Sequence, residues 1–173
     1  MSLKAPAAMR WAPMTRPVLR RCSIDPDATP VYERDDTYIP GMTFKLFLIA
    51  LPAFFAIDML WLGVIARRFY ARQLGDLIRR DVNWTAAVIF YLIFIVGLVV
   101  FVVVPAVDAS SLGRALGYGA FFGFVTYATY DLTNLATLRD WPLTMTLVDL
   151  AWGAVLAASV AGITYWVGTE FVL

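Results

Sequence analysis

Histidine is absent from the 173 residues, and cysteine occurs only once, as Cys22. A disulfide within the chain, a Cys/His zinc site and haem ligation by histidine are therefore excluded. The commonest general base of enzymes is also missing. Charged residues make up only 16% of the chain, whereas a soluble domain carries about 25%. The formal net charge of +1 gives no basic bias that would favour nucleic acid as a partner.

Apolar residues, in contrast, are abundant, at 61% of the chain. After Met42 they form four runs long enough to cross a hydrocarbon core of about 30 Å at about 1.5 Å per residue. Short connections between the runs predict that consecutive spans are antiparallel neighbours. The sequence therefore predicts an all-α membrane protein, in which residues 42–173 form a bundle of four transmembrane helices. The predicted spans cover about residues 44–66, 84–107, 115–138 and 141–167.

The first 41 residues differ from the rest, because they are rich in proline and arginine and contain no long apolar run. This composition predicts a disordered N-terminal tail. It does not predict a secretory signal, since no apolar segment follows the basic residues. A second interpretation stays open: translation begins at Met42, directly before the first span, and residues 1–41 are not part of the native protein.

Arginines are distributed unevenly between the predicted loops. The loop between the first two spans contains five of them, whereas the next loop contains only Arg114. Because positively charged loops stay on the cytoplasmic side, we expect both termini to lie outside the cytoplasm. The five arginines are Arg67, Arg68, Arg72, Arg79 and Arg80.

Three aspartates, Asp58, Asp131 and Asp149, lie within predicted spans. A carboxylate near mid-membrane costs about 2.5–3.5 kcal/mol on insertion scales, so such a residue usually faces the bundle interior and has a partner. Counted from the helix ends that share one membrane face, all three lie eight or nine residues deep. At about 1.5 Å per residue, this places the carboxylates about 12–13 Å below the same surface. One depth for three helices suggests a single site.

The third predicted span has the most polar face. Its stripe follows the i, i+3, i+4, i+7 spacing of one helix side and consists of Gly123, Tyr127, Tyr130, Asp131 and Asn134. Gly119 and Gly123 form a small-xxx-small pair that lets another helix approach closely. Tyr91 of the second span lies at a similar depth. We therefore expect an interior ring with a contribution from each helix, namely Asp58, Tyr91, Asp131 with Asn134, and Asp149.

A D-x-x-W pattern occurs in both the first and the fourth span. It runs from Asp58 to Trp61 and from Asp149 to Trp152, and a glycine follows each tryptophan within two residues. The two helices are predicted to run in opposite directions, so a related pair would be an inverted repeat, as in small transporters. Chance similarity is the alternative, and two matched positions do not decide between them.

The polar residues inside the membrane also have two interpretations. They form interhelical hydrogen bonds that act as packing glue, worth about 0.6 kcal/mol each. Alternatively, they form a functional site, because buried carboxylates with no lysine or arginine inside the membrane must take up protons or a cation. Proton exchange, cation binding and hydrogen bonding to a polar ligand all remain open under the second interpretation.

Three segments resemble a widespread bacterial family of small inner-membrane proteins with four predicted spans, a domain-of-unknown-function family. They are Asp58-Met-Leu-Trp61-Leu-Gly63, Tyr127-Ala-Thr-Tyr130-Asp131-Leu-Thr133-Asn134-Leu-Ala136-Thr137 and Val148-Asp149-Leu-Ala-Trp152-Gly153. The similarity covers Met42 to about Gly168. It implies a multi-pass protein of the bacterial inner (plasma) membrane and supports the choice of Asp58, Tyr130, Asp131, Asn134, Asp149 and Trp152. It brings no established activity.

The leading hypothesis is a membrane-embedded binding or transport module. A non-catalytic accessory subunit of a larger membrane complex or lipid-modifying system is the alternative, and a lipid-processing enzyme is the third. No P-loop, GxSxG, HExxH or Rossmann fingerprint occurs, so we assign no catalytic residue, cofactor or metal. The expected partner is the lipid bilayer, while a homodimer or a larger membrane complex stays open. The candidate binding residues are Asp58, Tyr91, Tyr127, Tyr130, Asp131, Asn134, Asp149 and Trp152.

Overall fold

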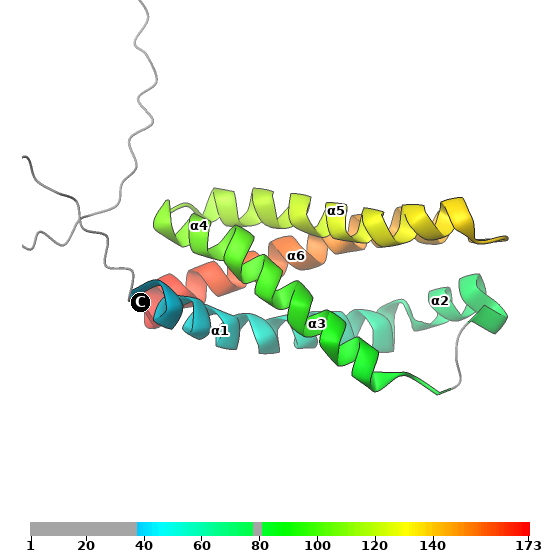
Figure 1. Ribbon diagram of the computed structural model, residues 1–173, viewed down its shortest axis with the longest axis horizontal. Coiled ribbons are helices and arrows are strands. Elements are labelled where there is room, and N and C mark those ends of the chain that lie inside the picture. Colours follow the sequence, from blue (N-terminus) through cyan, green and yellow to red (C-terminus); the bar gives the residue numbers. More distant parts are fainter. Residues whose placement is uncertain (1–37, 78–80) are drawn as a thin grey trace, which may run out of the picture.

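The computed structural model describes residues 38–77 and 81–173, and all regular secondary structure in these two ranges is helical (Figure 1). Most of the predicted tail, residues 1–37, lies outside the described residues. The first helix begins at Tyr38, four residues before the predicted boundary at Met42, and the boundary itself stays a prediction.

The helices follow one another along the chain with short connections. The α-helices are α1 (Tyr38–Leu60), α2 (Arg67–Leu74), α3 (Trp84–Leu98), α4 (Val104–Asp108), α5 (Leu112–Thr137) and α6 (Leu143–Phe171). Two π-helical turns, η1 (Trp61–Ile65) and η3 (Val99–Val103), continue α1 and α3, and a 3₁₀ turn, η2 (Gly75–Leu77), follows α2. Such π-helical turns are rare in proteins, and those that occur often lie at functional sites.

Three helices in the described residues are long and apolar enough to cross a membrane: Pro40–Ile65, Trp84–Asp108 and Leu143–Phe171. They coincide with the predicted first, second and fourth spans. The predicted third span is also a helix, α5, but its many glycine, threonine and tyrosine residues lower its mean hydropathy. The structure thus supports three spans, and the membrane crossing of α5, the predicted third span, stays a prediction.

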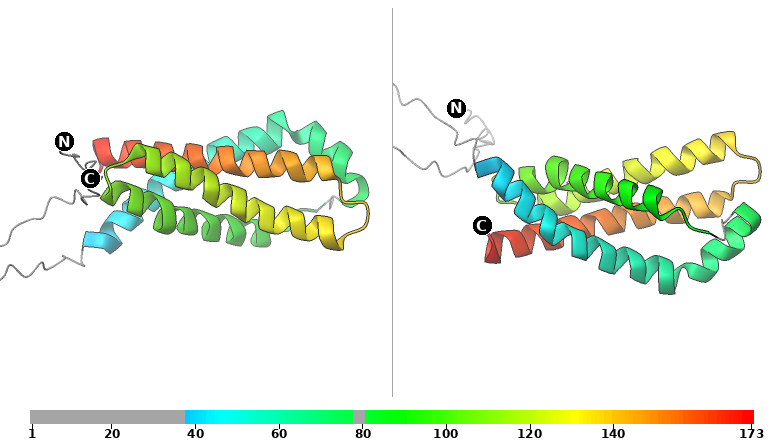
Figure 2. Two further views of the ribbon diagram at one scale, coloured as in Figure 1. Left: turned by 90° about the horizontal axis from the view of Figure 1, so that it is seen from above. Right: turned by 60° about the horizontal axis from the view of Figure 1, so that its bottom comes forward.

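The helices pack as an elongated bundle, with α5 antiparallel to α6 along most of its length (Figures 1 and 2). Helix α1 also runs antiparallel to α6, and α3 crosses α1 at a steeper angle. Side chains stabilise two of the helix starts. The side chain of Asn83 accepts a hydrogen bond from the Ala86 N–H at 3.1 Å, and Ser111 Oγ accepts one from the Arg114 N–H at 3.3 Å. Both are standard N-caps.

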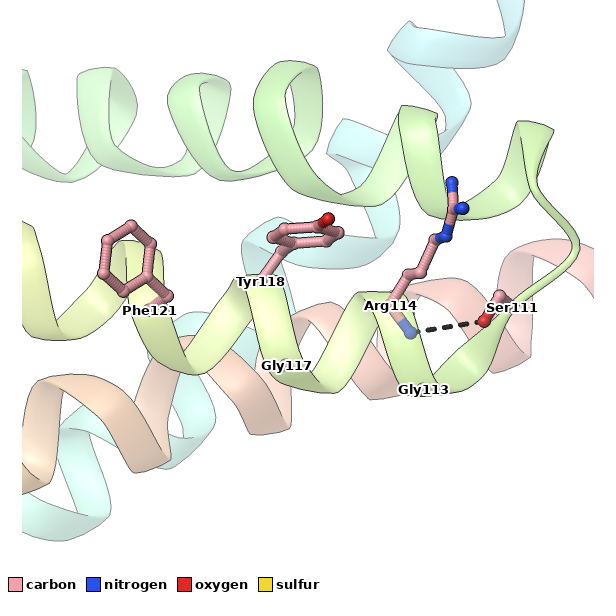
Figure 3. A pocket seen from close by; sticks show the side chains of 6 residues that line it. All are labelled: Ser111, Gly113, Arg114, Gly117, Tyr118 and Phe121. Atoms are coloured by element: carbon pink, nitrogen blue, oxygen red, sulfur yellow. Dashed lines mark hydrogen bonds between the residues drawn. The ribbon is translucent and has the colours of Figure 1, made fainter. Parts of the chain in front are cut away.

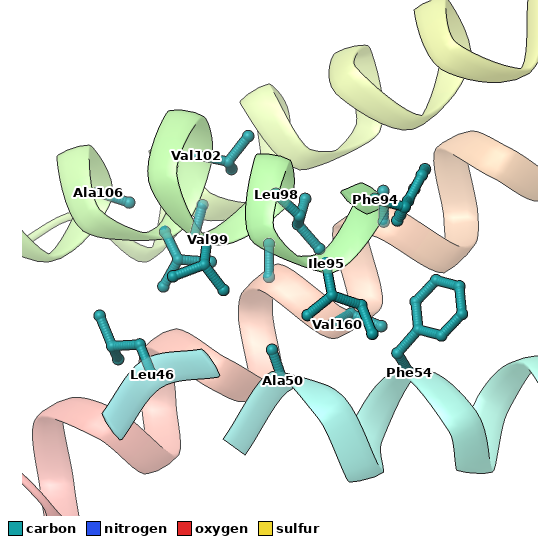
Figure 4. Packing of buried hydrophobic residues seen from close by; sticks show 14 of the residues in the cluster. Leu46, Ala50, Phe54, Phe94, Ile95, Leu98, Val99, Val102, Ala106 and Val160 are labelled. Carbon is teal, nitrogen blue, oxygen red and sulfur yellow. The ribbon is translucent and has the colours of Figure 1, made fainter. Parts of the chain in front are cut away.

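The apolar core lies where α1, the end of α3 with η3, and α6 meet (Figure 4). Helix α1 contributes every fourth residue to it: Leu46, Ala50 and Phe54 are at most 1% exposed. Ile95 and Val160 fill the space opposite, and both are completely buried. A step of four residues keeps side chains on one helix face. The residue four positions after Phe54 therefore also faces the bundle interior.

The closest contact between two helices joins α5 and α6 at glycines. A Cβ atom added to Gly123 would lie 1.9 Å from the carbonyl oxygen of Gly153, so the two backbones touch. Gly119 lies one turn earlier, and its Cβ would lie 2.9 Å from the carbonyl oxygen of Ala157. The prediction that Gly119 and Gly123 admit a neighbouring helix closely is confirmed.

Candidate functional site: a buried carboxylate cluster

All three aspartates predicted to face the interior are buried. Asp58 is 2%, Asp131 is 0% and Asp149 is 6% exposed. Asp58 and Asp149 belong to lines of buried residues spaced four apart, and Asp131 lies two such steps after Gly123, beyond the half-buried Tyr127. On α1 the line of Met42, Leu46, Ala50 and Phe54 ends with Asp58; on α5 it begins with Ala115, Gly119 and Gly123; on α6 it continues as Gly153, Ala157 and Ala161. The helix faces that build the core therefore also deliver the carboxylates.

The three aspartates come together at one end of the bundle. Asp58 lies in the last turn of α1, Asp131 in the last two turns of α5, and Asp149 in the second turn of α6. Figures 1 and 2 show the end of α1, the end of α5 and the start of α6 at the same end of the molecule. The fold thus places the three aspartates at the same end of the bundle, while a single site shared by all three stays a prediction.

Asp149 is bound by a tyrosine that the sequence analysis did not select. The Tyr70 hydroxyl donates a hydrogen bond to Asp149 Oδ1, and the indole N–H of Trp61 donates to the Tyr70 hydroxyl at 3.1 Å. Tyr70 lies on α2, which folds against the end of the bundle. Burial and the neighbouring Asp149 carboxylate raise the pKa of the Tyr70 phenol above its ordinary value, so Tyr70 remains a hydrogen-bond donor.

Asp58 has its own donors on α3 and α6. The Tyr91 hydroxyl hydrogen bonds to the Asp58 carboxylate. The indole N–H of Trp152 lies next to the same carboxylate, but its alignment falls short of a hydrogen bond. Tyr91 is held between Phe54 and Phe55, with ring centroids 5.3 Å from each. Aromatic packing thus positions the Tyr91 hydroxyl that hydrogen bonds to Asp58.

Two stacked indoles connect the two carboxylate sites. The rings of Trp61 and Trp152 lie 4.2 Å apart with an interplanar angle of 7°. The connection is crossed: Trp152 of α6 lies next to Asp58 of α1, whereas Trp61, which directly follows α1, reaches Asp149 of α6 through a tyrosine. The two D-x-x-W segments therefore form one structural unit.

The glycines that follow the two D-x-x-W segments are not equivalent. Gly153 is buried against α5, whereas a Cβ added to Gly63 would meet nothing within 4 Å. The likeness between the segments therefore does not extend to their glycines, and a common origin by internal repeat stays a prediction.

Tyr127 and Asp131 are the contributions of α5 to the cluster. The Tyr127 ring lies against Gly153, and its hydroxyl is within electrostatic reach of both Asp58 and Asp149. Both carboxylate oxygens of Asp131 lack a hydrogen-bond partner among the described residues, and Asp149 is within electrostatic reach of it. A fully buried and unpartnered carboxylate is unusual and calls for a functional explanation.

Two of the predicted binding residues lie at the edge of the cluster. Tyr130 is 59% exposed and packs edge-on against Trp141, and Asn134 is half-buried beside it. The prediction that Tyr130 shares the buried stripe of α5 is wrong. The reason is geometric: the buried line advances by four residues at a time, and each such step rotates it by about 40° around the helix. By Asp131 the line has turned away from Tyr130.

Trp61 and Tyr70 are the functional candidates that sequence reasoning missed. Trp61 belongs to the D-x-x-W pattern but was not chosen as a binding residue. Tyr70 was not considered because the segment from Arg67 onward was predicted to be a loop. A signal did exist: at 3.6 residues per turn, the arginines of Arg67–Leu74 fall on one helix side and Phe69, Tyr70 and Leu74 on the other, which indicates an amphipathic helix.

Two surface grooves are found elsewhere on the bundle. The larger, about 440 Å³, lies along the first half of α5 and is lined by Arg114, Tyr118 and Phe121 with neighbouring small residues (Figure 3). The smaller, about 300 Å³, lies between Phe44 and Phe47 of α1 and the valines of η3. Neither contains a residue of the carboxylate cluster. In the described ranges, no group of three or more acidic or cysteine side chains is arranged to hold a metal ion.

Comparison with known proteins gives one match. A family described as "Predicted membrane protein (DUF2177)" matches residues 43–166, a range that includes every member of the cluster. No curated protein and no solved structure matches the chain. The match confirms the resemblance seen in the motifs, whereas bacterial origin, the inner membrane and the orientation of the termini stay predictions. The chain therefore belongs to the DUF2177 family of predicted membrane proteins.

Proposed function

We propose that this membrane protein is a binding or transport module whose carboxylate cluster takes up and passes on protons. The observation that carries the proposal is the fully buried Asp131, whose two carboxylate oxygens have no partner in the described part of the chain and which is within electrostatic reach of Asp149. A carboxylate that only held helices together would have hydrogen-bond partners. Asp131 instead has two acceptor oxygens without a partner in the described ranges, within electrostatic reach of a second acid.

The donors around the cluster support protons as the bound species. Asp58 and Asp149 are addressed by tyrosine hydroxyls and lie near tryptophan N–H groups. No lysine or arginine in the described ranges contributes to these interactions. Carboxylates in a low-dielectric site without a cationic partner favour the protonated form. Hydroxyl groups between them can both donate and accept, as proton transfer requires.

Tyr70 supplies a route between the cluster and the membrane surface. It lies on α2, outside the three candidate spans, and donates directly to Asp149. Tyr127 is within electrostatic reach of both Asp149 and Asp58. A proton entering at Tyr70 would therefore pass to Asp149 and, by way of Tyr127 or Asp131, reach the interior. Cation or polar-ligand binding at the same residues is the less favoured variant of this proposal.

A direct test follows protonation by infrared spectroscopy on protein reconstituted in lipid nanodiscs. A change from alkaline to acidic buffer should produce a protonated-carboxyl band that Asp131→Asn and Asp149→Asn each reduce. The control is Asp108→Asn, at the exposed end of α4, which should leave the buried-carboxyl band unchanged. The proposal fails if folded Asp131→Asn and Asp149→Asn proteins give the wild-type band. Loss of folded Asp131→Asn protein from the membrane would favour the packing interpretation.

The outer face of α5 favours a second candidate function, docking on another membrane protein as an accessory subunit. Thr129, Thr133 and Thr137 are exposed there, and their hydroxyls hydrogen bond to carbonyls of their own helix. Gly117 on the same helix has nothing within 4 Å of an added Cβ. Small and threonine-rich faces of this kind occur at contacts between membrane helices. Crosslinking through cysteines placed at Thr129 and Thr133 in native membranes would test it, and capture of lipid alone would contradict it.

A further inference from the structure

Helix α2 separates its residues cleanly into two faces. Arg67, Arg68, Ala71 and Arg72 are exposed, whereas Phe69, Tyr70, Gln73 and Leu74 are half-buried. At 3.6 residues per turn, the first group covers one side of the helix and the second group the other. The inner side packs on the end of the bundle, where it brings the Tyr70 hydroxyl to Asp149. The outer side is positively charged.

The three arginines have no ion pair or side-chain hydrogen bond with any described residue, and no acidic residue lies between Arg67 and Leu74. Helix α2 begins two residues after the candidate span Pro40–Ile65 ends. The chain turns at Ala66, so that α2 leaves the direction of α1 (Figure 2). An unpaired basic face at the membrane boundary is complementary in charge to anionic lipid headgroups.

We propose that α2 is a surface helix that docks its arginine face on anionic phospholipid headgroups and thereby holds Tyr70 in place over Asp149. Guanidinium groups suit this role, because they form paired hydrogen bonds to phosphate oxygens. The π-helical turn η1 and Ala66 supply the hinge between the span and α2. In this proposal anionic lipid is a structural partner of the protein, and α2 is the segment that binds it.

The docking also has a consequence for the cluster, which rests on the function proposed above. With α2 held down, the Tyr70 hydroxyl bridges Trp61 and Asp149. With α2 released, Asp149 loses this donor and the end of the bundle opens to water. The lipid composition of the membrane therefore regulates access of protons to Asp149 through the position of α2.

Hydrogen–deuterium exchange on the full protein in nanodiscs tests the docking. Backbone amides of residues 67–74 should exchange up to about a hundredfold more slowly in nanodiscs with phosphatidylglycerol than in phosphatidylcholine alone, since each of the three arginines contributes about fivefold near an anionic surface. Combined Arg67→Gln, Arg68→Gln and Arg72→Gln substitutions should remove the difference, and high salt should reduce it. Arg114→Gln, at the exposed start of α5, is the matched control and should preserve the difference.

Two results would overturn the inference: equal exchange of α2 in both lipids, or a lipid effect that persists in the triple variant. Neither depends on protonation. The infrared carboxyl band, measured in the same nanodiscs, reports on the proposed function separately. A missing band with lipid-dependent exchange would refute proton binding and leave the docking intact, whereas the reverse result would refute the docking alone.

Discussion

The contact between Gly123 and Gly153 can be tested by adding a single methyl group. In Gly123→Ala the new Cβ would lie 1.9 Å from the Gly153 carbonyl oxygen, 2.6 Å from its carbonyl carbon and 2.7 Å from the Ala157 Cβ. Ordinary van der Waals contact begins at 3.4 Å, so the overlap with the oxygen is 3.4 − 1.9 = 1.5 Å. Two of these three atoms belong to backbone and cannot rotate away. The two helices must therefore separate.

Separation would reach beyond the mutated site. Overpacking a close-fitting interior costs about 1–3 kcal/mol, and a clash with backbone belongs at the upper end, near about 3 kcal/mol. Tyr127 rests directly on Gly153, so its ring should shift as α6 moves. Asp149 lies one turn from Gly153, and we expect its hydrogen bond with Tyr70 to loosen as well.

The assay is unfolding of the purified protein in detergent micelles, followed by circular dichroism as denaturant is added. Gly117→Ala on the same helix is the matched control, because its Cβ would meet nothing within 4 Å. Alanine is the better helix former by about 1 kcal/mol in water, so the control should be neutral or slightly stabilising. Equal stability of the two variants would refute the close helix contact and the geometry of the cluster that depends on it.

Two further predictions concern Tyr70. Tyr70→Phe removes the hydroxyl that joins Trp61 to Asp149 and should lower the free energy of unfolding by about 1–2 kcal/mol. The same denaturation experiment measures this loss, with Tyr118→Phe at an exposed position as the control. An unchanged stability of Tyr70→Phe would contradict the hydrogen-bonded bridge. Because burial and Asp149 raise the Tyr70 pKa in the folded state, this stabilisation is fully present below the unfolded tyrosine pKa of about 10 and is lost as pH rises above it. The free energy of unfolding should therefore decline less steeply between neutral and strongly alkaline pH in Tyr70→Phe than in the wild type. Parallel curves for the two proteins would contradict the raised pKa of Tyr70.

Much of this fold could be predicted from the sequence because membrane insertion imposes simple constraints. Long apolar runs define Pro40–Ile65, Trp84–Asp108 and Leu143–Phe171 to within a few residues. Asp58, Asp131 and Asp149 could be placed together by counting residues, since a helix has a fixed rise and the hydrocarbon core excludes charge. Placing them at the same end of the bundle needed no knowledge of side-chain packing.

The details of the cluster depend on geometry that periodicity does not contain. The crossing of α5 and α6 rotates the buried line along α5, which turns Tyr130 outward. The bend at Ala66 returns α2 to the bundle and places Tyr70 beside Asp149. Both effects arise from how whole helices pack, and residue spacing within one helix cannot reveal them.

The stacked pair of Trp61 and Trp152 gives the molecule an intrinsic optical reporter. Indole rings that lie parallel at 4.2 Å couple their electronic transitions, so the near-ultraviolet circular dichroism and the fluorescence of the pair depend on their separation. One ring follows α1 and the other belongs to α6. Any rearrangement that moves these helices apart, whether caused by pH, lipid or a bound partner, would change a spectral signal that requires no label.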